Sequence, residues 1–462
     1  MRLINRFIRV VGTALAPMLT LAMLTTPAVL AASPSEPIVD ARESVSDDLD
    51  WRFRWDNGFK LSRSDGAFKL KFGGRIMVDA GLNSLGRGLR SDFRAVDVLP
   101  LHGSGVEFRR ARIFFSGEVY DRVFFTANYD FAQNSDDDNP DFKDVFVGLK
   151  RLGFVNAAKV GHFKEPGFLQ EATSSKNITF IERGLNQAFF PGRNVGLMAD
   201  GTGFEKKLFW QLGVYRDAND QGFSFDDSGD ESWDLAGRVS MVPIYREGGK
   251  HVLHAGAGFI HRFLDAGPSG NLRFRSRPSA HLAQYFVDTE GRVDASDSNT
   301  LNLELAYVRG PFSAQAEYTY VWVEGNGAQR DLRFRGFYAF ASVFLTGEHR
   351  NYQLGKGKFD RVIPSANFDP ANGNWGAIEI AIRYGYLDLV SRDVRGGELW
   401  DLTVGVNWHL FPNFRWMLNY VHADVTKRVA TFTPKPPPIA PSISGRISGA
   451  GNMVATRFQF DF

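Results

Sequence analysis

Cysteine is absent from the 462 residues of the chain. This absence excludes disulfide scaffolds, thiol nucleophiles, and metal sites built from thiolates, such as structural zinc sites and iron–sulfur clusters. Export is not excluded, because a large β-fold buries enough surface to be stable without disulfides.

Long apolar runs are also missing. Beyond residue 31 no stretch approaches the ~20 apolar residues of a membrane-spanning helix, which excludes a helical-bundle membrane protein. Residues 1–31 begin with three arginines, continue as an apolar segment and end on Val29-Leu30-Ala31. Because Pro17 and Pro27 interrupt this segment, the pattern indicates a signal peptide over residues 1–31 that is cleaved on export, rather than an anchor helix.

Neither sign of charge dominates, with 54 Lys and Arg against 52 Asp and Glu. Removing the three arginines of residues 1–31 from the formal charge of +2 leaves −1 on the mature chain. A near-neutral chain gives no reason to expect a nucleic-acid partner. Any function based on charge must depend on where the charges lie.

What the sequence does contain is a repeated alternation of apolar and polar residues in segments of ~10 residues, which is typical of a transmembrane β-barrel. The last residues show it most clearly. One face would carry Val454, Thr456, Phe458, Phe460 and Phe462, and the other Ala455, Arg457, Gln459 and Asp461. The apolar face would promote aggregation in water but suits lipid. A soluble β-sandwich is the alternative, and it would not need polar residues along the whole opposite face of so many strands.

The alternation predicts an all-β fold, a 16-stranded antiparallel transmembrane barrel over residues 68–462, preceded by a periplasmic lead-in over residues 32–67. An even number of strands returns both ends to the periplasmic side. The predicted strands are 68–82, 106–119, 121–132, 142–150, 155–163, 194–203, 206–216, 231–242, 251–262, 299–309, 312–323, 333–346, 376–386, 399–409, 413–424 and 450–462.

The connections between these strands sort into two kinds. Tight turns are predicted at Tyr120-Asp121, Gly310-Pro311 and Phe411-Pro412-Asn413, on the periplasmic side. Long extracellular loops are predicted at 83–105, 164–193, 263–298 and 425–449. Residues 347–375 are long but fall on the periplasmic side, so either the strand count slips there or a long turn enters the pore. A barrel of this size encloses an aqueous lumen unless such segments constrict it.

Several stretches resemble the phosphate-selective porin O/P family of bacterial outer membranes. They are VGHFKEPGFLQEATSSKNITFIERGLNQAFFPGRNVG (160–196), FLTGEHRNYQLGKGKFDRV (344–362), the segments from 375 to 421, FKLKFGGRI (68–76) and the terminal RFQFDF. The resemblance implies a sixteen-stranded barrel, usually trimeric, that passes anions. It also implies an inward-folded constriction loop and a periplasmic turn that folds into the lumen.

Three arginines alternate in the segment LRFRSRP. In an extended chain Arg273, Arg275 and Arg277 would point the same way at ~6.8 Å spacing, and arginine presents five donors in a fixed fork that suits phosphate. Their loop resembles the family loop that carries a ladder of arginines. The alternative is a solvated loop whose arginines pair with Asp265, Asp288 or Glu290.

The long loop after the fifth strand carries Lys176, Arg183 and Arg193 as candidate anion contacts. The place of Lys176 matches the central pore lysine of the family. The alternative for Arg183 is that it and Glu182 only pin the loop to the wall.

The second strand carries Arg109, Arg110 and Arg112. Alternation points Arg110 and Arg112 into the lumen, whereas Arg109 would face lipid at a cost of ~2–4 kcal/mol unless a bulge or a rim position relieves it. Arg109 and Arg110 resemble the paired arginines near the family's constriction.

The sequence offers no catalytic residues, no metal ligands and no cofactor site. Asp136-Asp137-Asp138 lacks the glycine and glutamate of a calcium loop, and GKGK at 355–358 is too short for a phosphate-binding loop.

We therefore expect a passive channel for phosphate, polyphosphate or other small anions, in the outer membrane of a Gram-negative bacterium. The expected partners are those anions, outer-membrane lipid, two further copies in a homotrimer, and the barrel-assembly machinery through Phe462. A general weakly selective porin, an outer-membrane enzyme and an adhesin remain as alternatives.

Overall fold

The computed structural model describes residues 51–55, 58–95, 103–132, 141–222, 232–264, 272–291, 293–432 and 443–462. Residues 1–31, the Asp136–Asp138 run and the four prolines between 434 and 438 lie outside these ranges. None of the helices in the described ranges is long and apolar enough to cross a membrane.

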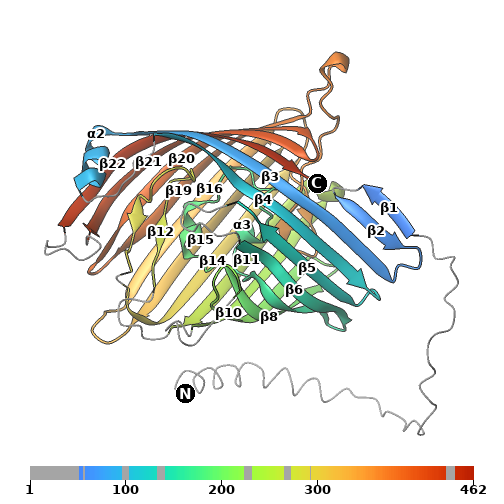
Figure 1. The fold of residues 1–462 in the computed structure, drawn as a ribbon, viewed down its shortest axis with the longest axis horizontal. Helices are drawn as coiled ribbons and strands as arrows, with labels where there is room; N and C mark the ends of the chain where they lie inside the picture. Colours follow the sequence, from blue (N-terminus) through green and yellow to red (C-terminus); the bar gives the residue numbers. More distant parts are fainter. Residues whose placement is uncertain are drawn as a thin grey trace, which may run out of the picture. The chain divides into compact units, whose positions relative to one another are not determined.

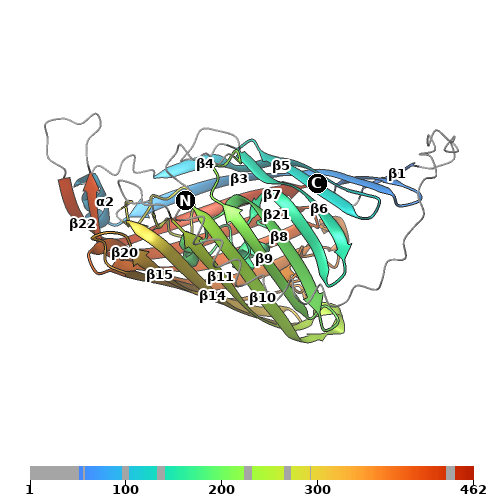
Figure 2. The same cartoon turned by 90° about the horizontal axis from the view of Figure 1, so that it is seen from below.

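Sixteen antiparallel strands form one closed sheet, as predicted, and Figures 1 and 2 show consecutive strands lying side by side. Closure is direct, because the last strand pairs with the first from Asp461↔Arg75 to Gly451↔Leu85. No strand of the closed wall then has an unpaired edge, which lipid would not tolerate. The strands are β3 (Phe68–Leu85), β4 (Ser104–Val119), β5 (Val123–Asp130), β6 (Asp141–Leu152), β7 (Val155–Lys164), β8 (Arg193–Gly203), β9 (Leu208–Arg216), β10 (Trp233–Arg246), β11 (His251–Phe263), β14 (Ala295–Arg309), β15 (Phe312–Gly325), β16 (Leu332–Phe344), β19 (Ala377–Ser391), β20 (Val394–Phe411), β21 (Phe414–Phe432) and β22 (Ile443–Asp461).

The predicted long loop at 425–449 is wrong. Strand β21 continues to Phe432 and β22 resumes at Ile443, with Arg428 opposite Ile447 after a register shift. The prediction failed because apolar alternation marks only the part of a strand that faces lipid, whereas backbone pairing continues beyond it.

The two faces of the wall match the predicted alternation. Leu82 and Phe458 point outward with 62% and 52% of their surface exposed, while Arg383 and Arg457 point inward and are fully buried. This reversal of the soluble pattern is what a lipid-facing barrel requires.

Most short turns lie at one end of the barrel, here called the short-turn end, and most long connections at the other, here called the long-loop end. The long connection 345–376 at the short-turn end and the two-residue turn 392–393 at the long-loop end are exceptions. At the short-turn end Tyr120 and Asp121 both have a φ of 54°, the left-handed pair of a type I′ hairpin turn. The long-loop end carries α2 (Arg87–Ala95).

Two further strands, β1 (Trp51–Trp55) and β2 (Phe59–Arg63), form a hairpin within the predicted lead-in. Strand β2 pairs with Lys69–Phe72 of β3 on the same edge that β22 occupies further along. The chain end lies at this junction (Figure 1), where the Gly74 amide donates to the Phe462 carbonyl oxygen at 2.8 Å.

Three connections fold inward as inserts. The constriction loop (165–192) contains α3 (Leu169–Ala172) and η2 (Leu185–Phe189). The arginine loop (described over 272–291) contains β12 (Arg275–Ser276) and β13 (Val287–Asp288). The inward turn (345–376) contains β17 (Tyr352–Gln353), β18 (Lys358–Phe359) and η5 (Pro370–Asn372). The strand count therefore did not slip, and the long turn at the short-turn end does enter the lumen.

We predict that Gly73→Ala destabilises the barrel. A Cβ at Gly73 would overlap the Phe462 carbonyl oxygen and lie 2.7 Å from the Phe114 ring, so we expect a loss of ~1–3 kcal/mol, the usual cost of overpacking. Thermal unfolding followed by the mobility shift of the folded band measures it. Gly88→Ala is the control, because a Cβ there meets nothing within 4 Å. Equal stability of the two variants would contradict the prediction.

Candidate functional site

The constriction loop is fixed to one side of the lumen by its own carbonyl oxygens. Each of the four strands β19–β22 supplies at least one donor. Asn407 donates to Thr179, Arg457 to Ile181, Arg383 to Glu182 and Arg415 to Ile178, at 2.7–2.9 Å. Because these carbonyls face the wall, the loop is held against β19–β22.

The start of the constriction loop has a separate anchor. The backbone amides of Leu169 and Gln170 both donate to the Glu317 carboxylate at 2.9 Å. Asn302 donates to the same carboxylate, also at 2.9 Å. A buried carboxyl with this many donors orients α3 within the lumen.

The inward turn is anchored by a buried network. Arg238 forms a two-pronged pair with Glu304 at 2.8 Å and donates to the Gly357 carbonyl at 2.7 Å. The His254 ring bridges Glu304 at 3.1 Å and the Tyr352 hydroxyl at 2.7 Å. The turn is thereby tied to the wall on strands β10, β11 and β14.

The arginine loop is held by residues of β4, β20 and β21, a different part of the wall from the strands that anchor the inward turn. Ser279 donates its amide to Asp401 at 3.0 Å, and the His281 ring lies 2.8 Å from Glu107. Arg428 donates to the carbonyl oxygens of Tyr285 and Phe286 at 2.6 and 3.1 Å. All three inserts are therefore fixed by hydrogen bonds to wall residues.

A cavity of about 310 Å³, the arginine cavity, lies between the constriction loop and the arginine loop. Five arginines line it from three separate parts of the chain, together with two glutamates. The charged lining residues are Arg109, Arg110, Arg183, Arg275, Arg277, Glu171 and Glu182.

A second cavity of about 600 Å³, the lysine cavity, lies towards the short-turn end. It shares Glu171 with the arginine cavity. Its other charged lining residues are Lys150, Lys159, Lys164, Arg238, Lys356, Lys358, Asp144, Glu165 and Asp200.

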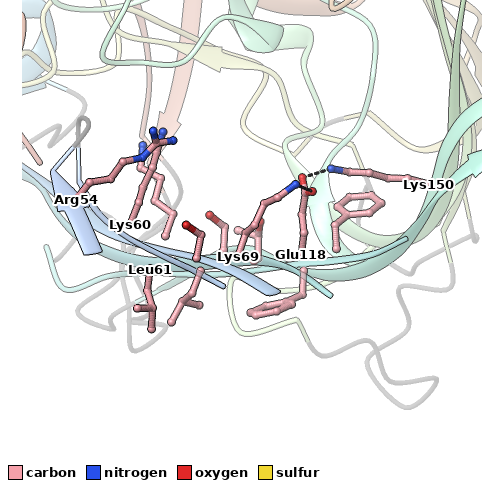
Figure 3. A pocket seen from close by; sticks show the side chains of 14 residues that line it. Arg54, Lys60, Leu61, Lys69, Glu118 and Lys150 are labelled. Carbon is pink, nitrogen blue, oxygen red and sulfur yellow. Dashed lines mark hydrogen bonds and ion pairs between the residues drawn. The ribbon is translucent and has the colours of Figure 1, made fainter. Parts of the chain in front are cut away.

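A third cavity of about 360 Å³ opens where the β1–β2 hairpin meets the wall. Figure 3 shows Arg54 and Lys60 on one side of this sheet and Leu61 on the other. Lys60 stands directly opposite Lys71 and Arg54 directly opposite Lys60, and like charges so placed repel. Lys150 lines this cavity as well as the lysine cavity, so cationic side chains follow one another along this wall.

Comparison with known proteins bears on the family and the fold of the chain. The family model described as phosphate-selective porin O and P matches residues 85–462. The chain belongs to this family. Porin O of Pseudomonas aeruginosa is 28% identical over 418 residues, covering 83% of this chain and 89% of that protein. An uncharacterised protein of Caulobacter vibrioides is 29% identical over 374 residues, covering 79% of this chain and 70% of that protein.

Solved structures share the fold. An anion-selective porin from Comamonas acidovorans has a TM-score of 0.50 and 12% identity, covering 86% of this chain and all of that one. OmpT, an outer membrane protein of Vibrio cholerae, has a TM-score of 0.50 and 10% identity, covering 86% and 98%. Family and fold indicate an outer-membrane porin channel rather than an enzyme.

In this porin the three arginines of the second strand all reach the lumen. The register shifts so that Met77 opposes Arg110 and Val78 opposes Phe108, which leaves Arg109 as the extra residue of a β-bulge. The bulge turns Arg109 inward, where it donates to Glu182 at 2.9 Å. Of the two alternatives predicted for Arg109, a bulge or a rim position, the structure has the bulge.

Arg110 and Arg112 differ in their partners. Arg112 forms an ion pair with Asp130 at 2.6 Å. Arg110 is 5% exposed and donates to the Met77 sulfur at 3.5 Å. Its Nε has no hydrogen-bond partner in the described part of the chain.

The candidates around the constriction loop each lie beside a carboxylate. Lys176 pairs with Asp461 at 3.0 Å, Arg183 with Glu171 at 2.9 Å and Arg193 with Asp144 at 3.0 Å. Burial lowers the pKa of the Lys176 ammonium to about 8, although Asp461 opposes the shift. Arg183 thus pairs within its own loop rather than with the wall.

The three alternating arginines do not act as one set. Arg273 forms a two-pronged pair with Asp288 at 2.6–2.8 Å. This pairing is the one that the alternative prediction, a solvated loop, gave for these arginines. Arg275 and Arg277 lie over the ring of Tyr285, 4.3 and 4.1 Å from its centre, and both line the arginine cavity.

Sequence reasoning missed the lysines of the lysine cavity. Lys159 and Lys164 are on β7, and Lys356 and Lys358 are on the inward turn. The alternation of β7 could have identified Lys159, whereas the turn residues were judged only as a phosphate-binding loop and rejected. In the described ranges no three His, Asp or Glu side chains gather as a metal site would require.

We predict that Arg457→Gln strongly destabilises the folded porin. Arg457 is fully buried and pairs with Asp79 at 2.6 Å and with Glu182 at 3.0 Å. Losing one member of a buried network leaves the carboxylates uncompensated, which costs ~3–5 kcal/mol. Urea unfolding of detergent-folded protein measures it. Arg335→Gln is the control, since Arg335 is 55% exposed in its pair with Asp388, and a comparable loss there would refute the argument.

Proposed function

We propose that this porin is a passive channel selective for small anions, with phosphate or polyphosphate as the ions that it binds. The single observation that carries the proposal is the arginine cavity. Five arginines reach it from β4, the constriction loop and the arginine loop, against two glutamates. Arginine forks bind phosphate oxygens in pairs and hold their charge at any physiological pH.

The way the constriction loop is docked supports this proposal. Its carbonyl oxygens, which would repel an anion, are directed at donors on β19–β22. The cavities lie instead beside β4–β10, where lysine and arginine side chains line both of them. A cleft lined by one sign of charge between low-dielectric walls raises the local concentration of the opposite ion.

The cationic residues also form a continuous series. Glu171 lines both the arginine cavity and the lysine cavity. Lys150 lines both the lysine cavity and the third cavity, where the β1–β2 hairpin meets the wall. An ion can conduct through such a series when neighbouring sites are close enough to hand it on. Inorganic phosphate, pyrophosphate and other small anions all fit this chemistry.

Assembly and export are proposed from the family resemblance. We propose a homotrimer in outer-membrane lipid, assembly by the barrel machinery through Phe462, and cleavage of residues 1–31 after export. The outward aromatic and aliphatic surface of the wall supports the lipid contact.

A general, weakly selective porin is the second candidate. The observation that favours it is the number of carboxylates along the same route, including Asp144, Glu171 and Glu182. Acids and bases facing one another would orient ions without holding phosphate.

Single-channel recording in a planar bilayer separates the two candidates. Under a potassium chloride gradient we expect a reversal potential of anionic sign, and we expect added phosphate to block the chloride current at a defined concentration. A large current that does not respond to phosphate would show that the protein is a channel and would contradict the proposed selectivity for phosphate.

We predict that replacing Arg275 and Arg277 together by glutamine weakens phosphate block. Each lost charge at the arginine cavity should raise the half-blocking concentration about tenfold, which corresponds to ~1.4 kcal/mol. Titration of the chloride current with phosphate measures it. Arg273→Gln is the matched control, because Arg273 is engaged with Asp288. If the control weakens block as much as the double variant, the assignment is wrong.

A further inference from the structure

Glu171 is the lining residue that the arginine cavity and the lysine cavity have in common, and its position is here called the junction. It lies on α3 in the constriction loop and is 6% exposed. It lines both the arginine cavity and the lysine cavity. Each of the two cavities therefore has the same carboxylate in its wall.

The cationic side chains of Lys164 and Arg183 both contact Glu171. Lys164 donates to the Glu171 backbone oxygen at 3.0 Å and also to its carboxylate. The Nε of Arg183 lies 2.9 Å from the carboxylate and donates to the Gln170 carbonyl at 2.9 Å. A terminal nitrogen of the same guanidinium donates to the Thr173 carbonyl at 3.2 Å. Both cations are therefore occupied while Glu171 is in place.

The carboxylate is ionised at every physiological pH. Burial alone would raise the pKa of Glu171, but attraction to Arg183 and Lys164 lowers it to about 2. Glu171 thus carries a permanent negative charge at the junction, of the same sign as the ion that we propose to pass.

We infer that Glu171 is a built-in counter-anion that sets how tightly the pathway holds a permeating anion. The inference rests on the proposed function and deepens it, because it names the residue that limits affinity. A phosphate at the junction competes with the carboxylate for Lys164 and Arg183. Conduction requires sites that bind strongly enough to admit an ion and weakly enough to release it, and Glu171 supplies the weakening.

The docking of the constriction loop does not depend on Glu171 alone. The amide bonds to Glu317 and the carbonyl contacts to β19–β22 do not involve its side chain. Lys164 also keeps the backbone oxygen of residue 171 as an acceptor. Glu182 differs, since it pairs with the fully buried Arg457.

The test compares Glu171→Gln and Glu171→Asp with the unaltered porin in planar bilayers, with inorganic phosphate titrated against a chloride current. Glutamine keeps the size and one acceptor oxygen but removes the charge, so we expect half-block at about tenfold lower phosphate (~1.4 kcal/mol) and a smaller maximal phosphate current. Aspartate keeps the charge and should retain block within about twofold of the unaltered porin. Glu247→Gln, an exposed change of equal charge at the turn after β10, should alter neither quantity.

The outcomes separate this inference from the proposed function. If the unaltered porin shows no phosphate block, the proposed function itself fails. If the unaltered porin is blocked and Glu171→Gln requires the same or more phosphate, only the counter-anion role fails. The same holds if Glu171→Asp behaves like Glu171→Gln, because shape rather than charge would then be responsible. A folded-band mobility assay on each variant shows that the barrel has formed.

Discussion

The lumen of this porin depends on one kind of interaction, the hydrogen bond from a wall side chain to a carbonyl oxygen of an inserted segment. A loop inside a barrel carries backbone groups that neither a helix nor a sheet satisfies, and each buried one left without a partner is costly. Arg383, Asn407, Arg415 and Arg457 satisfy the constriction loop, while Arg238 and Arg428 do the same for the inward turn and the arginine loop. The route for ions exists because these donors hold each insert to one side.

The same donors determine which charges remain for a passing ion. Arg383, Arg415 and Arg457 on β19, β21 and β22 donate to loop carbonyls, and Arg457 also pairs with a buried carboxylate, so these arginines stabilise the fold. Arginines and lysines on the opposite wall and on the inserts line the cavities instead. Arg275 and Arg277 both lie over the ring of Tyr285. The ring thus brings two guanidinium groups close together despite their mutual repulsion. A stacked ring accepts positive charge on its face without cancelling it.

Carboxylates along the cavities limit how tightly the cations can hold an anion. A pore lined only by cations would bind phosphate too firmly to release it, since the low-dielectric walls strengthen every charge interaction. Glu171 and Glu182 lie among the arginines, and attraction to those neighbours outweighs burial and keeps the pKa of both carboxyls below the ordinary range. The balance between fixed cations and fixed acids therefore decides whether the porin is selective or merely conducts.

Local patterns in the sequence predicted the barrel, its sixteen strands and the inward direction of most candidate residues, because period-two alternation and lipid-facing apolar residues are local properties. The cost of a charge in lipid left a bulge or a rim position for Arg109, and the strand count left two explanations for residues 347–375. The tertiary structure was needed to show that Arg273 pairs with Asp288, that Arg275 and Arg277 line one cavity with Arg109 and Arg110, and that Glu171 lines two cavities. The arginine cavity joins segments more than a hundred residues apart. Arg273 and Asp288 are only 15 residues apart, but several acids lie within reach of this arginine, so the local pattern does not select the partner.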